Sequence, residues 1–257
     1  MKEFLEARAA EINSPAFINE DPVQFPRRFS DLRDIEIAAL LSSSIAWGNR
    51  KMICRNADRI LSLMADDPAR FVSDGEYEQV PDEMNLHRTF FGRDFKYLLR
   101  GYHRIMRDYG SLDAFCRAVV PEGAEGAPWL LAGEFCKILR EENDGKDDPR
   151  CFPAKTDTTA LKRFNMALRW LVRNDGIVDL GVWKSLKPSQ LYIPLDVHVG
   201  RTARDLGLLS RRSNDRKAVE ELTAHLREWR PDDPCLFDYA LFGLGVESSR
   251  KAESSQE

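Results

Sequence analysis

Apolar residues recur at helical spacing along most of the chain. The clearest case is residues 158–173, where Leu161, Phe164, Leu168 and Leu171 fall on one side of a predicted helix. Similar patterns predict helices over residues 3–12, 35–47, 50–64, 90–109, 111–120, 129–139, 214–228 and 236–246. We find no β-hairpin signal, no phosphate-binding glycine pattern and no repeat of fixed period. The sequence therefore predicts an all-α protein.

The other side of the helix at 158–173 carries only positive charge. Lys162, Arg169 and Arg173 stack at positions i, i+7 and i+11, and Arg163 and Trp170 flank them. A solvated helix face normally alternates positive and negative side chains, whereas this helix contains no acid. The stripe suits phosphate contacts. The alternative is pairing with acids elsewhere in the fold, such as Asp144, Asp147, Asp148 or Asp179.

A single carboxylate stands at the start of another predicted helix. Asp196 follows Pro194, and Val199 and Ala203 begin an apolar helix face after it. Asp is a favoured N-cap because its carboxylate accepts hydrogen bonds from the first turn, and the helix dipole stabilises the anion. Asp196 is therefore either a structural cap or a carboxylate at a cleft mouth that stabilises a cationic transition state.

The predicted helix at 50–64 opens with two cations. Gly48 and Asn49 end the preceding helix, and Arg50 and Lys51 then occupy the first turn. The positive end of the helix dipole disfavours cations at this position. Their placement suggests a phosphate-facing site, although a flanking acid would explain it as well.

Charge and composition narrow the class further. The net charge of −4 argues against binding nucleic acid through the overall charge, but screening over about 10 Å leaves room for a local basic cleft. The amino-terminal segment is polar and no apolar run is long enough to cross a bilayer, so we expect a cytoplasmic protein without membrane contact. The five cysteines and four histidines form no metal-ligand spacing, and we expect neither a metal nor a cofactor.

Several motifs together resemble a known superfamily. They are Leu40-Leu-Ser-Ser-Ser-Ile-Ala-Trp-Gly48, Lys162-Arg-Phe-Asn-Met-Ala-Leu-Arg-Trp170, Pro194-Leu-Asp-Val-His198 and Asp238-Tyr-Ala-Leu-Phe-Gly-Leu-Gly245. Over roughly residues 30 to 246 the chain resembles an uncharacterised bacterial branch of the helix-hairpin-helix (HhH-GPD) DNA glycosylase superfamily.

The resemblance implies a two-lobed helical fold with DNA bound in a central cleft. Residues 31–190 would form a helical barrel lobe, and residues 1–30 with 191–246 a second lobe built from both chain ends. Residues 247–257 would be a disordered polar tail. Asp196 matches the catalytic aspartate of the superfamily, which implies a monofunctional DNA-repair hydrolase that cleaves the N-glycosidic bond of a flipped, damaged base.

The cationic stripe, the basic helix start and the matched motifs together define a candidate site. The candidate nucleic-acid contacts are Arg50, Lys51, Lys162, Arg163, Arg169, Arg173, His198 and Arg201. The candidate base pocket comprises Ser44, Trp47, Asn165 and Trp170. For Trp47, Trp170 and His198, packing within the fold is the alternative.

One expected element is degenerate. The glycine-rich hairpin that donates backbone N–H groups to phosphate in the superfamily is not readable in residues 181–190. Lys184 and Lys187 lie there outside the motif of the Schiff-base lysine, so we predict no lyase activity. Two alternatives to a glycosylase remain, a non-catalytic nucleic-acid-binding protein that kept the fold and an α-helical interaction protein.

Overall fold

Helices dominate the computed structural model, which describes residues 1–254, with side chains as far as residue 248. The helices are α1 (Lys2–Ile12), α2 (Pro15–Glu20), α3 (Leu32–Ser44), α4 (Arg50–Leu63), α5 (Pro68–Ser73), α6 (Gly92–Tyr109), α7 (Leu112–Val119), α8 (Ala127–Glu141), α9 (Lys162–Val172), α10 (Val197–Asp205), α11 (Arg216–Trp229) and α12 (Phe237–Ser254). The mostly helical class is confirmed. None of the described helices combines the length and apolar character that crossing a bilayer requires.

Short polar side chains fix where many of these helices begin. The N-cap side chains that accept a hydrogen bond from the first turn include Asp31, Asn49, Ser111, Asp196 and Asp215. Each bond satisfies a backbone N–H that has no partner within the helix. The helices predicted from apolar spacing therefore begin within a few residues of their expected starts.

The sequence pattern missed the short helices α2 and α5 and a small antiparallel sheet. Strands β1 (Asn85–His87) and β2 (Phe90–Phe91) pair across a turn in which Arg88 has a positive φ of 49°. Asn85 Nδ2 donates to Arg88 O over 2.6 Å and closes this turn. The turn lacks the Asn-Gly or Gly-rich pair that marks hairpins in a sequence. Phe90 and Phe91 consequently belong to a strand, and α6 starts after them.

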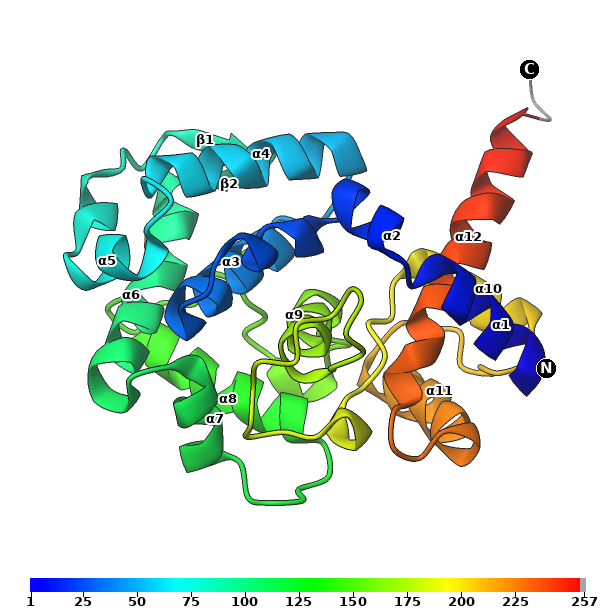
Figure 1. Ribbon diagram of the computed structural model, residues 1–257. Helices are drawn as coiled ribbons and strands as arrows, with labels where there is room; N and C mark the ends of the chain where they lie inside the picture. Colours follow the sequence, from blue (N-terminus) through cyan, green and yellow to red (C-terminus); the bar gives the residue numbers. More distant parts are fainter. Residues whose placement is uncertain (255–257) are drawn as a thin grey trace.

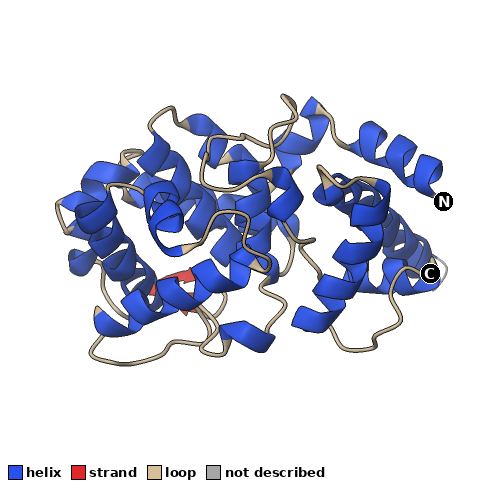
Figure 2. Ribbon diagram, turned by 90° about the horizontal axis from the view of Figure 1, so that it is seen from below, coloured by secondary structure: helices blue, strands red, loops and turns tan. Residues whose placement is uncertain are grey.

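The helices form two groups (Figure 1). One group contains α1, α10, α11 and α12, in which α1 and α10 both pack against α12. The other extends from α3 to α9, with α3 against α9 and α6 against α8, and Figure 2 shows the sheet within it. The division into a barrel lobe at residues 31–190 and a second lobe from both chain ends stays a prediction. Helix α12 continues through Ser254, past the expected start of a disordered tail, and residues 255–257 lie outside the described residues.

Glycines permit the close helix crossings on α12. A Cβ on Gly245 would lie 3.0 Å from the Cβ of His198 in α10, and one on Gly243 would lie 2.0 Å from Ile12 Cδ1 in α1. A Cβ at Gly245 would press on the backbone of α10, whereas the end of the Ile12 side chain could move away from one at Gly243. The two glycines thus bring the amino-terminal helix and the helix of Asp196 onto one carboxy-terminal helix.

Candidate functional site

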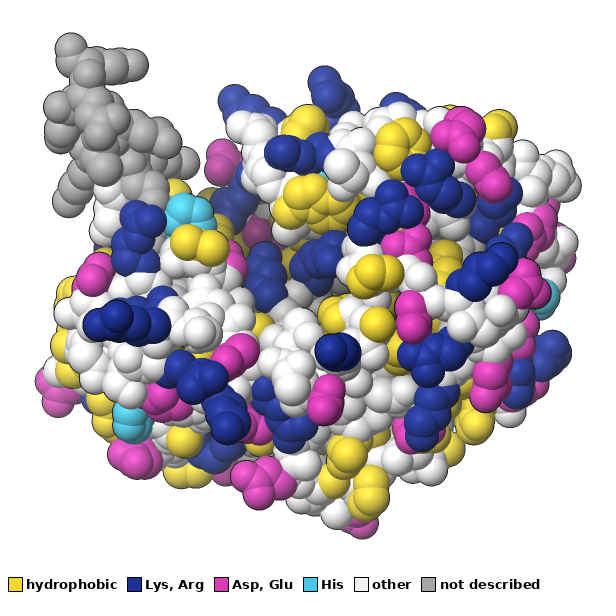
Figure 3. All heavy atoms as spheres, turned by 180° about the vertical axis from the view of Figure 1, so that it is seen from behind, with side chains coloured by type: hydrophobic (Ala, Val, Ile, Leu, Met, Phe, Trp, Pro, Cys, Tyr) yellow, Lys and Arg dark blue, Asp and Glu magenta, His cyan; other side chains and the backbone are white. Residues whose placement is uncertain are grey.

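A cleft of about 1350 Å³ opens where segments distant in the sequence meet. Its walls come from the end of α3, the starts of α4, α9 and α10, residues 151–153 and Phe242 of α12. The face drawn in Figure 3 is hollowed, and Lys and Arg side chains gather in the hollow. The predicted site residues that line the cleft are Ser44, Trp47, Arg50, Lys51, Lys162, Arg163, Asp196 and His198.

Asp196 both caps α10 and faces the cleft. Its Oδ1 accepts a hydrogen bond from Val199 N over 2.9 Å, and its backbone carbonyl accepts one from Asn214 Nδ2 over 3.1 Å. Among the described residues, Oδ2 accepts no hydrogen bond. The side chain is half-buried at the lining of the cleft. The capping role and a chemical role are therefore compatible, because they use different oxygens.

Arg163 brings positive charge without a carboxylate partner. Its Nη1 donates to Ser44 O over 2.5 Å, and its Nη2 donates to Arg150 O over 3.4 Å. The guanidinium also lies 5.1 Å from the ring centroid of Trp47. Burial lowers the pKa of Arg163, and no acid in the described part of the chain lies within ion-pairing distance of it. Its neighbour Lys162, which begins α9, likewise has no ion pair in that part.

A buried histidine also contacts the Trp47 ring. The rings of Trp47 and His87 meet edge to face, 4.8 Å apart. His87 Nε2 lies 3.0 Å from Trp47 O, and its Nδ1 lies 2.9 Å from Asn56 Nδ2. A neutral ring with its proton on Nε2 satisfies both contacts. Sequence reasoning missed His87 and Asn56, because a lone histidine in an unrecognised strand carries no signal.

The first turn of α4 carries two cations, of which Arg50 has an acidic partner and Lys51 has none among the described residues. Arg50 Nη2 lies 3.5 Å from Asp21 Oδ2, and its guanidinium lies 5.5 and 5.0 Å from the ring centroids of Phe17 and Phe242. The flanking acid explains its position at the helix start. Lys51 is exposed and has no ion pair with a described residue. Lys51 remains available to an anion at the rim of the cleft.

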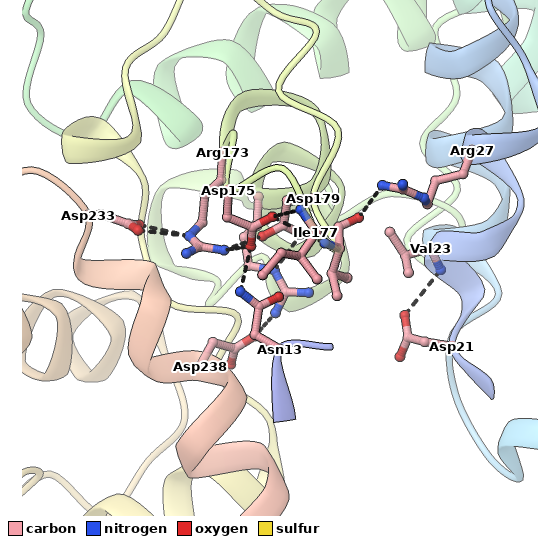
Figure 4. A network of polar contacts seen from close by, with 12 residues as sticks. Asn13, Asp21, Val23, Arg27, Arg173, Asp175, Ile177, Asp179, Asp233 and Asp238 are labelled. Carbon is pink, nitrogen blue, oxygen red and sulfur yellow. Dashed lines mark hydrogen bonds and ion pairs between the residues drawn. The ribbon is translucent and has the colours of Figure 1, made fainter. Parts of the chain in front are cut away.

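Two residues of the cationic stripe are not available to phosphate, which corrects our expectation for Arg169 and Arg173. Each is 4% exposed. Arg169 pairs with Asp238 and, over 3.3 Å, with Asp179. Arg173 bonds Asp179 and Asp233, each over 2.9 Å (Figure 4). The alternative that the stripe pairs with distant acids holds for these two arginines, and Asp179 is one of the acids considered.

Two expected pocket residues also need correction. Asn165 and Trp170 are 1% and 0% exposed and do not belong to the cleft lining. Asn165 Nδ2 donates to Ala160 O over 3.0 Å, within the fold. Both residues face the interior because α9 packs against α3 and α8 and is covered on most sides.

The ion-pair network reaches the neighbourhood of Asp196. The pKa of Asp238 is raised to about 6, chiefly by burial, with the charge of Asp196 acting in the same direction and Arg169 opposing it. Lys162 also opposes the rise. The cleft carboxylate thus lies close to a second, buried carboxylate whose charge is held by Arg169.

Two backbone N–H groups within residues 181–190, where the resemblance implied a hairpin, are occupied. Lys184 N and Ser185 N donate to Asp113 Oδ1 over 3.0 and 2.9 Å. These two donors are therefore not available to a phosphate oxygen. Arg201, the remaining predicted contact, is exposed and lies outside the cleft, in a groove beside it.

A cluster of possible metal ligands lies elsewhere. Donor atoms of Asp94, Asp148 and Cys151 fall within 4.8 Å of one another. Asp94 already accepts hydrogen bonds from Phe91 N over 2.7 Å and from Arg150 Nη2 over 3.2 Å. Burial raises the pKa of Cys151, so its thiol stays protonated. The contacts are explained by anchoring of the loop around residue 150, beside the cleft.

Comparisons with known proteins give a family but no activity. No curated protein and no solved structure matches the chain. A family model described as "Protein of unknown function (DUF2400)" matches residues 21–247. Apart from Asn19 and Glu20, this match includes all the residues that line the cleft. The chain belongs to the DUF2400 family.

Proposed function

We propose that the protein is a monofunctional N-glycosylase acting on DNA in base-excision repair, with Asp196 as its catalytic carboxylate. The observation that carries the proposal is the composition of the cleft. It combines a half-buried carboxylate, an aromatic ring held by Arg163 and His87, and cations without acidic partners in the described chain. The resemblance of the Pro194–His198 motif to the HhH-GPD superfamily supports the same assignment.

The chemistry uses these groups in defined ways. The bond between C1′ of the sugar and the base nitrogen breaks, and its electron pair leaves with the base. Asp196 stabilises the positive charge that develops on the sugar, and water then adds to C1′ and releases a proton. Arg163 and Lys162 stabilise the negative charge that develops on the departing base. The target base would leave its stack and lie against Trp47.

Asp196→Asn tests the role of the carboxylate. Asn is as good an N-cap as Asp, so the variant keeps α10 while it removes the negative charge. We expect base release from a panel of damaged DNA duplexes, measured by chromatography of the free base, to fall by at least about 100-fold. Base release by Asp196→Asn at the rate of the unaltered protein would remove Asp196 from the mechanism.

A second cap provides the matched control. Asp31 caps α3 and lies outside the cleft, so Asp31→Asn makes the same chemical change away from the site. This variant should release base at the rate of the unaltered protein. If Asp31→Asn lost as much base release as Asp196→Asn, the effect would come from changing an N-cap and not from removing a carboxylate of the cleft.

The occupied N–H groups of Lys184 and Ser185 favour one second candidate, a non-catalytic nucleic-acid-binding protein. Such a protein would bind DNA or RNA with an affinity that falls as salt rises, and it would release no base from any substrate. An α-helical interaction protein, the remaining alternative, would bind neither nucleic acid even at low salt. Binding and release assays on the same panel separate the three.

A further inference from the structure

A second, shallower groove adjoins the cleft. It has a volume of about 470 Å³ and is lined by Val197, Arg201, Arg204, Asp205, Arg212 and Asn214. Val197 and Asn214 line both the cleft and the groove. Val197 is 64% exposed, so an apolar side chain forms the ridge between the two concavities.

The central cation of the groove is fixed by neutral groups. Arg204 Nε donates to Arg211 O over 2.8 Å, and its Nη2 donates to Arg212 O over 2.9 Å and to Asn214 Oδ1 over 2.6 Å. The loop after α10 is thus wrapped around the guanidinium. Because none of the three acceptors is charged, the positive charge of Arg204 is positioned but not neutralised.

Two more arginines stand free at the sides of the groove. Arg201 and Arg212 are exposed, and neither forms an ion pair with a described residue. The lining contains one acid, Asp205, against three arginines. Three arginines against one acid provide a local positive field on a protein whose net charge is −4.

We propose that this arginine groove binds the phosphates that flank the target nucleotide, so that the substrate is a polynucleotide strand rather than a free nucleoside. The inference rests on the proposed function. The order of surfaces supports it, since a cleft with the unpaired cations Lys162 and Arg163, an apolar ridge and a basic groove match a strand in which sugar and base separate successive phosphates. Arg204 supplies a fixed contact, and Arg201 and Arg212 supply adaptable ones.

The groove also replaces an anchor that the chain lacks. With Lys184 N and Ser185 N bonded to Asp113, the segment before Asp196 has those two donors occupied. The arginines follow Asp196 in the sequence instead, on α10 and in the loop behind it. The strand would therefore be held on the side of the cleft toward residues 201–214.

Arg201→Ala/Arg212→Ala tests the groove without disturbing the loop, because Arg204 keeps its three bonds. Fluorescence anisotropy of a labelled oligonucleotide would give the affinity at a series of salt concentrations. Removing two phosphate contacts should reduce the slope of log affinity against log salt by about 1.8 on duplex and about 1.4 on a single strand. The control Lys137→Ala/Lys146→Ala removes the same charge from side chains that line neither concavity, and its slope should match the unaltered protein.

Failure of the groove and failure of the glycosylase are distinguishable. Suppose that Arg201→Ala/Arg212→Ala has the affinity and salt slope of the lysine control, while Asp196→Asn still loses base release. That result would overturn the groove proposal and leave the glycosylase proposal standing. The groove proposal would also be overturned if Arg201→Ala/Arg212→Ala lost as much affinity for polyglutamate as for the oligonucleotide, since the surface would then be a general site for acidic chains. A reduced slope for oligonucleotides alone supports the groove even if no base is released from any substrate.

Discussion

Arg169 is the residue on which the buried ion pairs depend most directly. It joins Asp179 and Asp238 in the interior, where it is 4% exposed, and its guanidinium lies 4.5 Å from the ring centroid of Tyr239. A buried charge that loses its partner must be neutralised or exposed to water. Because Arg169 pairs with two buried carboxylates, we expect its substitution to lower the stability of the fold.

We expect Arg169→Ala to lower the free energy of unfolding by about 3–5 kcal/mol, because two buried carboxylates lose their shared cation. Urea denaturation followed by circular dichroism measures the change. The comparison is Arg33→Ala, which breaks the exposed pair of Arg33 and Asp31 and should alter stability little. Similar urea midpoints for Arg169→Ala and Arg33→Ala would contradict the conclusion that Arg169 holds a buried ion-pair network.

His87 makes stability depend on pH. Burial lowers the pKa of His87 below its ordinary value of 6.5. As the pH falls below about 6.5, His87 of the unfolded chain binds a proton while His87 of the folded chain stays neutral, and the free energy of unfolding decreases. The stabilisation from His87 is therefore complete above pH 6.5 and is lost as the pH falls through the pKa of the folded state. Protonation would also turn Nδ1 into a donor that faces the Asn56 amide donor.

Urea unfolding between pH 8 and pH 5 tests this, with His87→Gln as the reference that cannot titrate. The stability difference between the two proteins should narrow as the pH falls, because the other titrating groups are common to both. Parallel curves would show that His87 is not kept neutral by the fold.

At the scale of elements, the crossing of α10 on α12 depends on Gly245. A Cβ there would lie 3.0 Å from His198 Cβ, 3.1 Å from Thr202 Oγ1 and 3.2 Å from the carbonyl carbon of His198. The backbone atom cannot rotate away as the end of a side chain can. Any substituent must therefore shift α10, which carries Asp196 at its start.

We expect Gly245→Ala to cost about 1–3 kcal/mol of stability through this overpacking. Gly133→Ala is the matched control, since its Cβ would meet only Thr156 Oγ1 at an ordinary 3.8 Å within α8. That variant should gain up to about 1 kcal/mol from helix propensity. Thermal unfolding of both variants gives the comparison, and stabilisation by Gly245→Ala would refute the tight crossing.

Most helix positions could be predicted from the sequence, whereas the contacts that their side chains make with distant residues could not. Periodicity placed α3, α4 and α9, and the N-cap assignment of Asp196 is confirmed, because these depend on residues a few positions apart. The stripe on α9 could not be resolved in the same way. Arg163 faces the cleft and Arg169 the interior, and only packing with residues as distant as Asp238 separates them.

For the whole molecule, the cleft is a property of assembly rather than of any segment. Ser44, Lys162 and Asp196 belong to separate helices or their caps, and they line one cavity because α3 packs on α9 and α10 on α12. Sequence motifs nominated these residues individually. Their convergence depends on long-range packing, for which a single sequence carries no local pattern.

The position of Trp47 has a practical consequence. Of the five tryptophans in the chain, Trp47 is the one among the described cleft-lining residues. Its half-buried indole lies beside a guanidinium, so displacement of water or movement of Arg163 should change its emission. We expect an oligonucleotide to shift the emission of the unaltered protein and of Trp229→Phe, but not of Trp47→Phe. The cleft therefore contains its own optical reporter, and occupancy can be followed in solution without labelling either molecule.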